Sequence, residues 1–236
     1  MNRILKIISL LLSYPTPELQ LGGEELKEAL AGERLSPGIR RLLDSLVDYV
    51  CDCDLYEAQE RYVHLFDRTR SLSLHLFEHV HGESRDRGQA MVDLMKMYDD
   101  NGFVVDAREL PDYLPLFLEF LSTRSPEEIH DLLTQTGHIT AAIGERLRKR
   151  QSPYANAFAA LLHVANAKPD QSLVVELLRQ EEDDPNDLAA LDRIWEEEAV
   201  TFGGNAGENA CGPDRLRMQM RAAQRKPGSP SNPSHL

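Results

Sequence analysis

The chain of 236 residues repeatedly places a helix-capping side chain directly before proline. A serine or aspartate at the N-cap accepts a hydrogen bond from the first free backbone N–H groups, and proline suits the first helical position. A further start is indicated at Asp54, because Glu57 follows at the spacing of a capping box. The pattern predicts a succession of helices joined by short connections. The capped prolines are Ser36-Pro37, Ser125-Pro126, Ser152-Pro153 and Asp184-Pro185.

Between these starts the apolar residues recur with a period near 3.6 rather than 2, as helices require. Aromatic residues make up only 6% of the chain, whereas a protein rich in strands normally uses more. The sequence therefore predicts an all-α fold, a single irregular bundle of about nine or ten helices. Three apolar faces carry this prediction: Leu42, Leu43, Leu46, Val47 and Val50; Tyr154, Phe158, Leu161, Leu162 and Ala165; and Leu188, Leu191, Ile194 and Trp195.

The N-terminal segment 1–13 has some features of a signal peptide, but its details favour the first helix of the domain. Lys6 interrupts the apolar run, and Tyr14-Pro15 follows where small residues would mark cleavage. The apolar residues of the segment keep helical spacing, and no run in the chain has the roughly 18 apolar residues of a membrane-spanning helix.

The composition changes near residue 203, so we expect an all-helical domain over 1–203 and a disordered, basic tail rich in Gly, Pro and Ser over 204–236. The net charge is −13, and residues 211–236 carry +4, which leaves −17 on the preceding part. An acidic body repels nucleic acid and anionic membrane surfaces, and it suits a cationic peptide as partner. Three cysteines, Cys51, Cys53 and Cys211, are too few for a disulfide framework and fit a reducing compartment.

The densest part of the sequence is a predicted helix over 71–81 that ends at Gly82, with Ser84 capping the next helix. Charged and titratable side chains crowd this corner, which we interpret as part of a polypeptide-binding groove. They are Glu78, His79, His81, Glu83, Arg85, Asp86 and Arg87.

A second predicted helix begins at Pro111 and is apolar nearly all round. Asp112 and Glu119 are seven residues apart, so on one helix they project to the same side two turns from each other. Two carboxylates there would hold Arg or Lys of a partner beside apolar contacts from Leu116, Phe117 and Phe120. Alternatively the two carboxylates pair internally, with Arg85, Arg87 or Arg108, and the sequence leaves both interpretations open.

An enzymatic alternative rests on His75-x-x-Glu78-His79, the pattern of an inverted zinc protease motif. On a helix, His75 and His79 would share a zinc ion, with Glu78 as general base of a hydrolase. The pattern is short, and no third ligand stands out downstream, so we expect neither a metal site nor another cofactor.

Several segments closely resemble the NarJ family, the assembly chaperones of respiratory nitrate reductase, which are related to TorD-like chaperones. The resemblance rests on Leu65 to Arg70, Ser73 to Leu94 and Arg108 to Glu119, and extends to Tyr14-Pro15, Ser152 to Ala155 and Trp195 to Glu198. It covers the chain from the first helix to about Phe202.

The resemblance implies a TorD-like helical chaperone in the cytoplasm and no enzyme. Its partner would be the N-terminal segment of the catalytic (alpha) subunit of nitrate reductase, held until the molybdenum cofactor is inserted and before docking to the membrane subunit. Proteins of molybdenum cofactor biosynthesis are further candidate partners. Two positions depart from the family pattern. Tyr113 stands where the wider family has His, and His75 stands where the family has an apolar residue, which weakens the zinc interpretation.

Overall fold

The computed structural model describes residues 2–81, 85–105, 109–166 and 168–180. The chain divides into two units, residues 1–193 and 194–236, and the second lies wholly outside the described residues. The predicted boundary at 203, the basic tail, Asp184-Pro185 and the apolar face around Trp195 therefore lie outside them as well. All of the described helices belong to the first unit.

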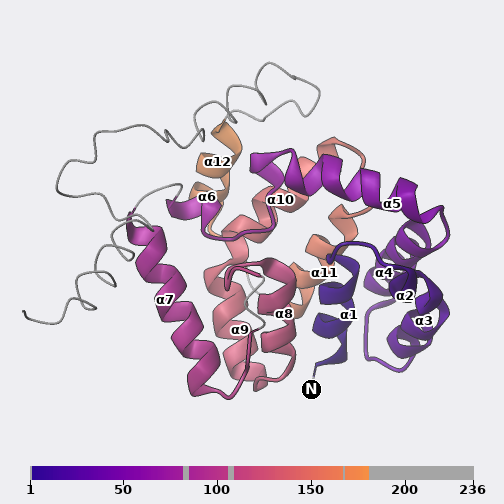
Figure 1. Ribbon diagram of the computed structural model, residues 1–236, viewed down its shortest axis with the longest axis horizontal. Helices are drawn as coiled ribbons and strands as arrows, with labels where there is room; N and C mark the ends of the chain where they lie inside the picture. The colour runs from indigo at the N-terminus through magenta and orange to yellow at the C-terminus, as the bar shows by residue number, and fades with distance from the viewer. Residues whose placement is uncertain (1, 82–84, 106–108, 167, 181–236) are drawn as a thin grey trace, which may run out of the picture. The chain divides into compact units, whose positions relative to one another are not determined.

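The all-α prediction is confirmed, since the described residues form helices and no strand (Figure 1). They contain twelve α-helices instead of the expected nine or ten, because α2 and α6 are single short turns. The α-helices are α1 (Arg3–Leu11), α2 (Pro17–Leu21), α3 (Gly23–Ala31), α4 (Pro37–Cys51), α5 (Leu55–Tyr62), α6 (Glu78–His81), α7 (Arg85–Asp100), α8 (Leu114–Ser122), α9 (Pro126–Gln135), α10 (Gly137–Lys149), α11 (Ala155–Ala165) and α12 (Gln171–Arg179). A π-helical segment η1 (Val63–Asp67) continues α5, and a 3₁₀ turn η2 (Arg70–Leu72) follows.

The predicted helix starts are largely confirmed. Ser36 caps α4 by accepting from the Ile39 N–H, and Ser125 forms a complete capping box with Glu128 at the start of α9. Asp54 caps α5 through the N–H groups of the first turn. The start at Ser152 is displaced, because residues 153–154 form a turn and α11 begins at Ala155.

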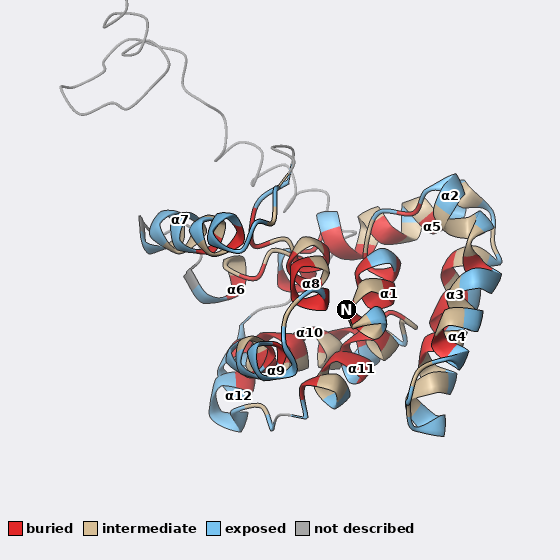
Figure 2. Ribbon diagram, turned by 90° about the horizontal axis from the view of Figure 1, so that it is seen from below, coloured by how far each residue is buried: buried red, intermediate tan, exposed pale blue. Residues whose placement is uncertain are grey.

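The helices pack around α11, which contacts α1, α4, α9 and α10. In Figure 2, α1 lies above α11, α8 and α7 lie to its upper left, α9, α10 and α12 lie to its left, and α2 to α5 lie to its right. The close approach of α10 to α11 depends on Gly144, where an added Cβ would lie 3.0 Å from the Phe158 Cβ. The N-terminal helix is part of the core, as its apolar spacing predicts, since Leu5, Ile8 and Leu11 are fully buried.

The predicted helix over 71–81 is wrong. Residues 70–72 form the 3₁₀ turn η2, residues 73–77 are extended and then turn, and only 78–81 are helical. The apolar side chains at Leu72, Leu74 and Leu76 are all buried, so the segment is held by the core around it and not by helical hydrogen bonds. Tertiary packing has overridden the local helical spacing.

One buried cation fastens this segment to the rest of the unit. Arg146 of α10 is fully buried, and its guanidinium donates to the Ser71 carbonyl at 2.8 Å and to the Leu177 carbonyl at 2.5 Å. It therefore joins η2, α10 and the end of α12.

We expect Arg146→Met to lower the free energy of unfolding by roughly 2–4 kcal/mol, because two buried carbonyls lose a charged donor. Urea unfolding at neutral pH measures the change. Arg148→Met is the matched control two residues away, since the Arg148 side chain is 74% exposed and its ion pair with Glu145 should be worth less than about 1 kcal/mol. Equal losses in the two variants would contradict the role of Arg146.

Candidate functional site

The most buried acidic side chain among the described residues is Asp112, which is 0% exposed. It precedes α8, and its carboxylate accepts hydrogen bonds from the Phe77 backbone N–H at 3.0 Å and from His75 Nδ1 at 3.3 Å. Its carbonyl accepts from the Leu76 N–H at 3.0 Å. Asp112 thus closes the turn at 75–77 from both its backbone and its side chain.

A short antiparallel contact completes this junction. His75 and Tyr113 form a β-bridge, the Leu114 N–H donates to the Leu74 carbonyl at 2.8 Å, and the rings of His75 and Tyr113 lie 5.5 Å apart. The junction places the extended segment 73–77 across the N-terminus of α8, so two stretches that the sequence analysis singled out separately do meet.

The prediction that Asp112 and Glu119 project together from one helix is wrong. Helix α8 begins only at Leu114, and Asp112 faces the 75–77 turn, whereas Glu119 pairs with Lys6 of α1. Of the two open interpretations, internal pairing is the one that the structure shows, although with partners other than the arginines considered. Asp112 is closed to solvent, while the Glu119 side chain keeps 42% of its exposure.

The geometric premise of the zinc hydrolase is also wrong, because His75 is not helical and does not stand one turn from His79. His79 is buried and donates from Nε2 to the Ser73 carbonyl at 2.8 Å, away from the His75–Asp112 pair. Burial lowers the pKa of His79, so it is neutral near pH 7. Within the described ranges, no group of three His, Cys, Asp or Glu residues is placed to hold a metal ion.

The charged corner is only partly open to solvent. Glu78 of α6 pairs with Arg87 of α7 at 3.1 Å, and Asp86 is exposed at the start of α7. Glu83 lies outside the described residues, and the side chains of His81 and Arg85 are likewise not described.

The apolar residues proposed for client contact separate into two groups. Phe117 and Phe120 are buried in the core, where the Phe120 ring packs on Tyr98 of α7 at 4.8 Å, so neither presents a surface to a client in this structure, and their contact with one stays a prediction. Leu116 is half-buried. It follows Tyr113 by three residues, which places both on the same edge of α8.

Three aromatic or apolar side chains at the junction are half-buried and partly accessible. His75, Tyr113 and Leu116 form this surface, which we call the α8 strip. Carboxylates border it. Glu78 and Asp112 act electrostatically on His75. Burial raises the pKa of Tyr113 to about 12, and the nearby charges of Glu109 and Asp67 add to that rise. The strip therefore offers aromatic and aliphatic surface within a rim of Asp67, Glu78 and Glu109, of which Glu78 is already paired with Arg87.

Tyr62, at the end of α5, supports the strip from behind. Its hydroxyl donates to the Leu12 carbonyl at 3.1 Å, so the 2.8 Å contact with the Tyr113 hydroxyl is donated by Tyr113. The Tyr62 ring also packs edge-on against Tyr14 at 5.6 Å. Tyr14 in turn lines a groove of about 610 Å³, which no single sequence motif indicated.

The groove brings together segments that are far apart in the sequence. Tyr14, Leu65 and Ser152, each from a stretch that carries the family resemblance, all line it. The separate short motifs were the available signal, but only the fold shows that they surround one space.

Comparison with known proteins defines the class. A family model described as "Nitrate reductase delta subunit" matches residues 32–160. The nitrate reductase molybdenum cofactor assembly chaperone NarJ of Escherichia coli K12 is 41% identical, covering 92% of this chain and 91% of its own length. The probable chaperone NarW of the same strain is 42% identical over 93% and 91%, and the probable NarJ of Bacillus subtilis is 32% identical over 66% and 83%.

The helical fold and these similarities define an assembly chaperone and not an enzyme. The chain belongs to the NarJ family of nitrate reductase delta subunits. None of the helices in the described part of the chain combines the length and apolar character needed to cross a membrane.

We expect Asp112→Ala to lower the free energy of unfolding by roughly 2–4 kcal/mol, because the Phe77 N–H and His75 lose a buried charged acceptor. Glu119→Ala, which removes only a partly exposed ion pair, should cost less than about 1 kcal/mol. Chemical unfolding followed by circular dichroism distinguishes them. A smaller loss for Asp112→Ala than for Glu119→Ala would show that the junction does not depend on this carboxylate.

The His75–Asp112 pair should also make stability depend on pH. Burial of His75 disfavours its charged form, but the hydrogen bond and charge of Asp112 outweigh this, so the pKa of His75 is raised above 6.5. The resulting stabilisation is complete below the unfolded-state pKa and is lost as pH rises through the folded-state pKa.

The unfolding free energies of the wild type and His75→Gln should therefore differ more at about pH 5.5 than at about pH 8.5. The lowered pKa of His79 acts in the opposite direction, but His79 is present in both proteins and largely cancels in the comparison. A difference that grew with pH would contradict the assigned pair.

Proposed function

We propose that this chain binds the N-terminal segment of the catalytic subunit of respiratory nitrate reductase in the cytoplasm. It holds that subunit while the molybdenum cofactor is inserted, before the subunit docks to its membrane partner. The observation that carries the proposal is the 41% identity with a nitrate reductase molybdenum cofactor assembly chaperone over 92% of the chain. Proteins that synthesise the cofactor are proposed as transient further partners.

The α8 strip is the surface we assign to the client segment. It pairs half-buried apolar and aromatic side chains with an acidic rim, and this combination suits a peptide that is cationic and partly apolar. Aromatic side chains at such a surface supply contact area with little loss of rotamer freedom. Asp112 does not touch the client in this proposal, and its role is to hold His75 and Tyr113 in place.

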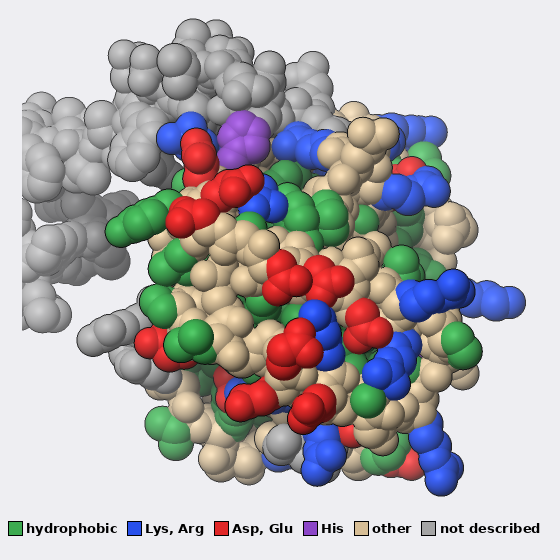
Figure 3. Space-filling view, turned by 90° about the vertical axis from the view of Figure 1, so that its right-hand side faces the viewer, with side chains coloured by type: hydrophobic (Ala, Val, Ile, Leu, Met, Phe, Trp, Pro, Cys, Tyr) green, Lys and Arg blue, Asp and Glu red, His purple; other side chains and the backbone are tan. Residues whose placement is uncertain are grey.

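The charge of the protein supports the same client chemistry. The net charge is −13, and acidic side chains also gather on the face formed by α2 to α5 (Figure 3). Such a field attracts a cationic segment from a distance, whereas the short-range contacts at the α8 strip fix its position. Arg87, which pairs with Glu78 of the rim, and the exposed Asp86 that precedes it are proposed as secondary contacts.

Isothermal titration calorimetry with a synthetic peptide of the client's N-terminus tests this assignment. The double variant Asp67→Asn/Glu109→Gln should bind roughly three- to tenfold more weakly at low salt, since each lost pairing is worth about 0.2–1 kcal/mol. Leu116→Ala should weaken binding about fivefold through lost apolar contact. The effect of the charge variant should diminish at high salt, and that of Leu116→Ala should not.

The matched control is Glu25→Gln/Glu28→Gln, which removes the same charge from exposed positions of α3. If this control weakened binding as much as the rim variant does, only the overall charge would matter, and the α8 strip would not be the site. If the wild type failed to bind the peptide at all, the client assignment itself would be wrong.

A further inference from the structure

The groove beside Tyr62 has a chemistry that the proposed client does not use. Its lining contains three tyrosines and three arginines: Tyr14, Tyr49, Tyr56, Arg61, Arg68 and Arg150. They come from the α1–α2 connection, α4, α5, the segment after η1 and the α10–α11 connection. Glu60 is the one acidic side chain among the described lining residues. Three arginines of a protein of charge −13 therefore surround this groove.

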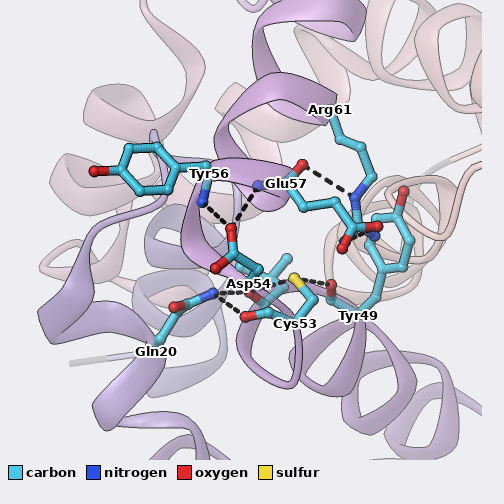
Figure 4. Close-up of polar contacts among 8 residues, drawn as sticks. Gln20, Tyr49, Cys53, Asp54, Tyr56, Glu57 and Arg61 are labelled. Carbon is cyan, nitrogen blue, oxygen red and sulfur yellow. Dashed lines mark hydrogen bonds and ion pairs between the residues drawn. The ribbon is translucent and has the colours of Figure 1, made fainter.

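One wall of the groove is rigidly built. Figure 4 shows α5 held at its start by Asp54, which accepts from the N–H groups of Tyr56 and Glu57 at 2.9 and 3.3 Å. The Arg61 guanidinium lies over the Tyr49 ring, 4.5 Å from its centroid, and pairs with Glu57 at 3.3 Å. These contacts fix both a cation and an aromatic face at the edge of the groove before any ligand arrives.

The floor is equally fixed. Gln59 donates to the Pro15 carbonyl at 2.9 Å, which ties the α1–α2 connection to α5. Behind it, Tyr62, Phe66 and Tyr154 form a buried aromatic cluster with ring centroids 5.0–6.4 Å apart. A preformed hollow of this kind is typical of small-molecule sites, and about 610 Å³ falls within their usual size range.

Two kinds of side chain remain accessible in it. Tyr14 is 44% exposed and Tyr56 is 79% exposed, so aromatic surface is presented to solvent. Arg68 is also exposed, and within the described ranges its guanidinium makes no ion pair. Aromatic faces bind planar rings by stacking, and a guanidinium fork binds phosphate oxygens in a bidentate manner.

We propose that this groove binds a small ligand that combines an aromatic heterocycle with a phosphate group. The tyrosines stack on the heterocycle, and Arg68 binds the phosphate with Arg150 close by. An acidic polypeptide would use the same arginines, but each added negative charge is repelled by the acidic body of the chain. A compact ligand with one phosphate meets the local cations and avoids most of that repulsion.

Titration calorimetry of the full chain with AMP and GMP, two probes of this class, tests the proposal. At least one of them should bind saturably, and adenosine, guanosine and inorganic phosphate should each bind at least about tenfold more weakly, because each supplies only half of the contacts. Arg68→Ala should weaken nucleotide binding about tenfold, which corresponds to one charged hydrogen-bonding group. Tyr56→Ala, which removes an exposed ring, should weaken it severalfold.

Arg34→Ala is the matched control, since Arg34 is an exposed arginine between α3 and α4 that does not line the groove. It should bind the nucleotide as the wild type does. Circular dichroism and thermal midpoints of all variants confirm that they fold. Tyr56→Ala should keep its affinity for the client peptide, so failure of the groove proposal and failure of the client proposal are distinguishable.

Three results would overturn the inference. The first is no saturable binding of either nucleotide at millimolar concentration. The second is binding that Arg68→Ala and Tyr56→Ala leave unchanged, which would place the nucleotide elsewhere. The third is displacement of the nucleotide by a polyglutamate peptide with equal or higher affinity, which would assign the groove to acidic polypeptides.

Discussion

The junction between the extended segment 73–77 and the start of α8 depends on one buried carboxylate. The carboxylate of Asp112 accepts hydrogen bonds from the Phe77 backbone N–H and from His75. It can do so because residues 73–77 are not helical. A buried charge is stabilising only when its partners satisfy it, so the turn and Asp112 require each other. The accessible surface of Tyr113 and Leu116 exists in its present form because this junction holds.

Local sequence signals predicted much of the fold and less of the site. Capping residues such as Ser36 and Ser125 act within one turn of their own helix, so their effect is visible in the sequence. The segment 71–81 has helical spacing as well, but its leucines point into a core contributed by distant elements, and Arg146 binds its backbone from 75 residues away. Long-range partners of this kind leave no local signature. The same reason explains why Asp112 was interpreted as a ligand group and why Lys6 was missed as the partner of Glu119.

The family resemblance favoured a chaperone over a zinc hydrolase, a choice that apolar periodicity could not make. The structure then distinguished the motif residues that are buried from those that line a groove. His79 and Asp112 hold the domain together, since both are buried and bonded to the backbone of the same segment, 73–77. Tyr14 and Ser152 lie at the rim of a groove instead. The motifs of the resemblance therefore contain both residues that are buried in the domain and residues that line a groove.

Tyr62 belongs to both surfaces, because its hydroxyl accepts from Tyr113 of the α8 strip while its ring packs on Tyr14 of the groove. A ligand that shifts this ring from either side alters the surface on the other. Thermodynamic linkage requires any such coupling to be reciprocal: a client that weakens the affinity of the groove by some factor is itself weakened by the groove's ligand by the same factor. Through Tyr62, the proposed client and the proposed groove ligand would therefore each change the affinity of the other.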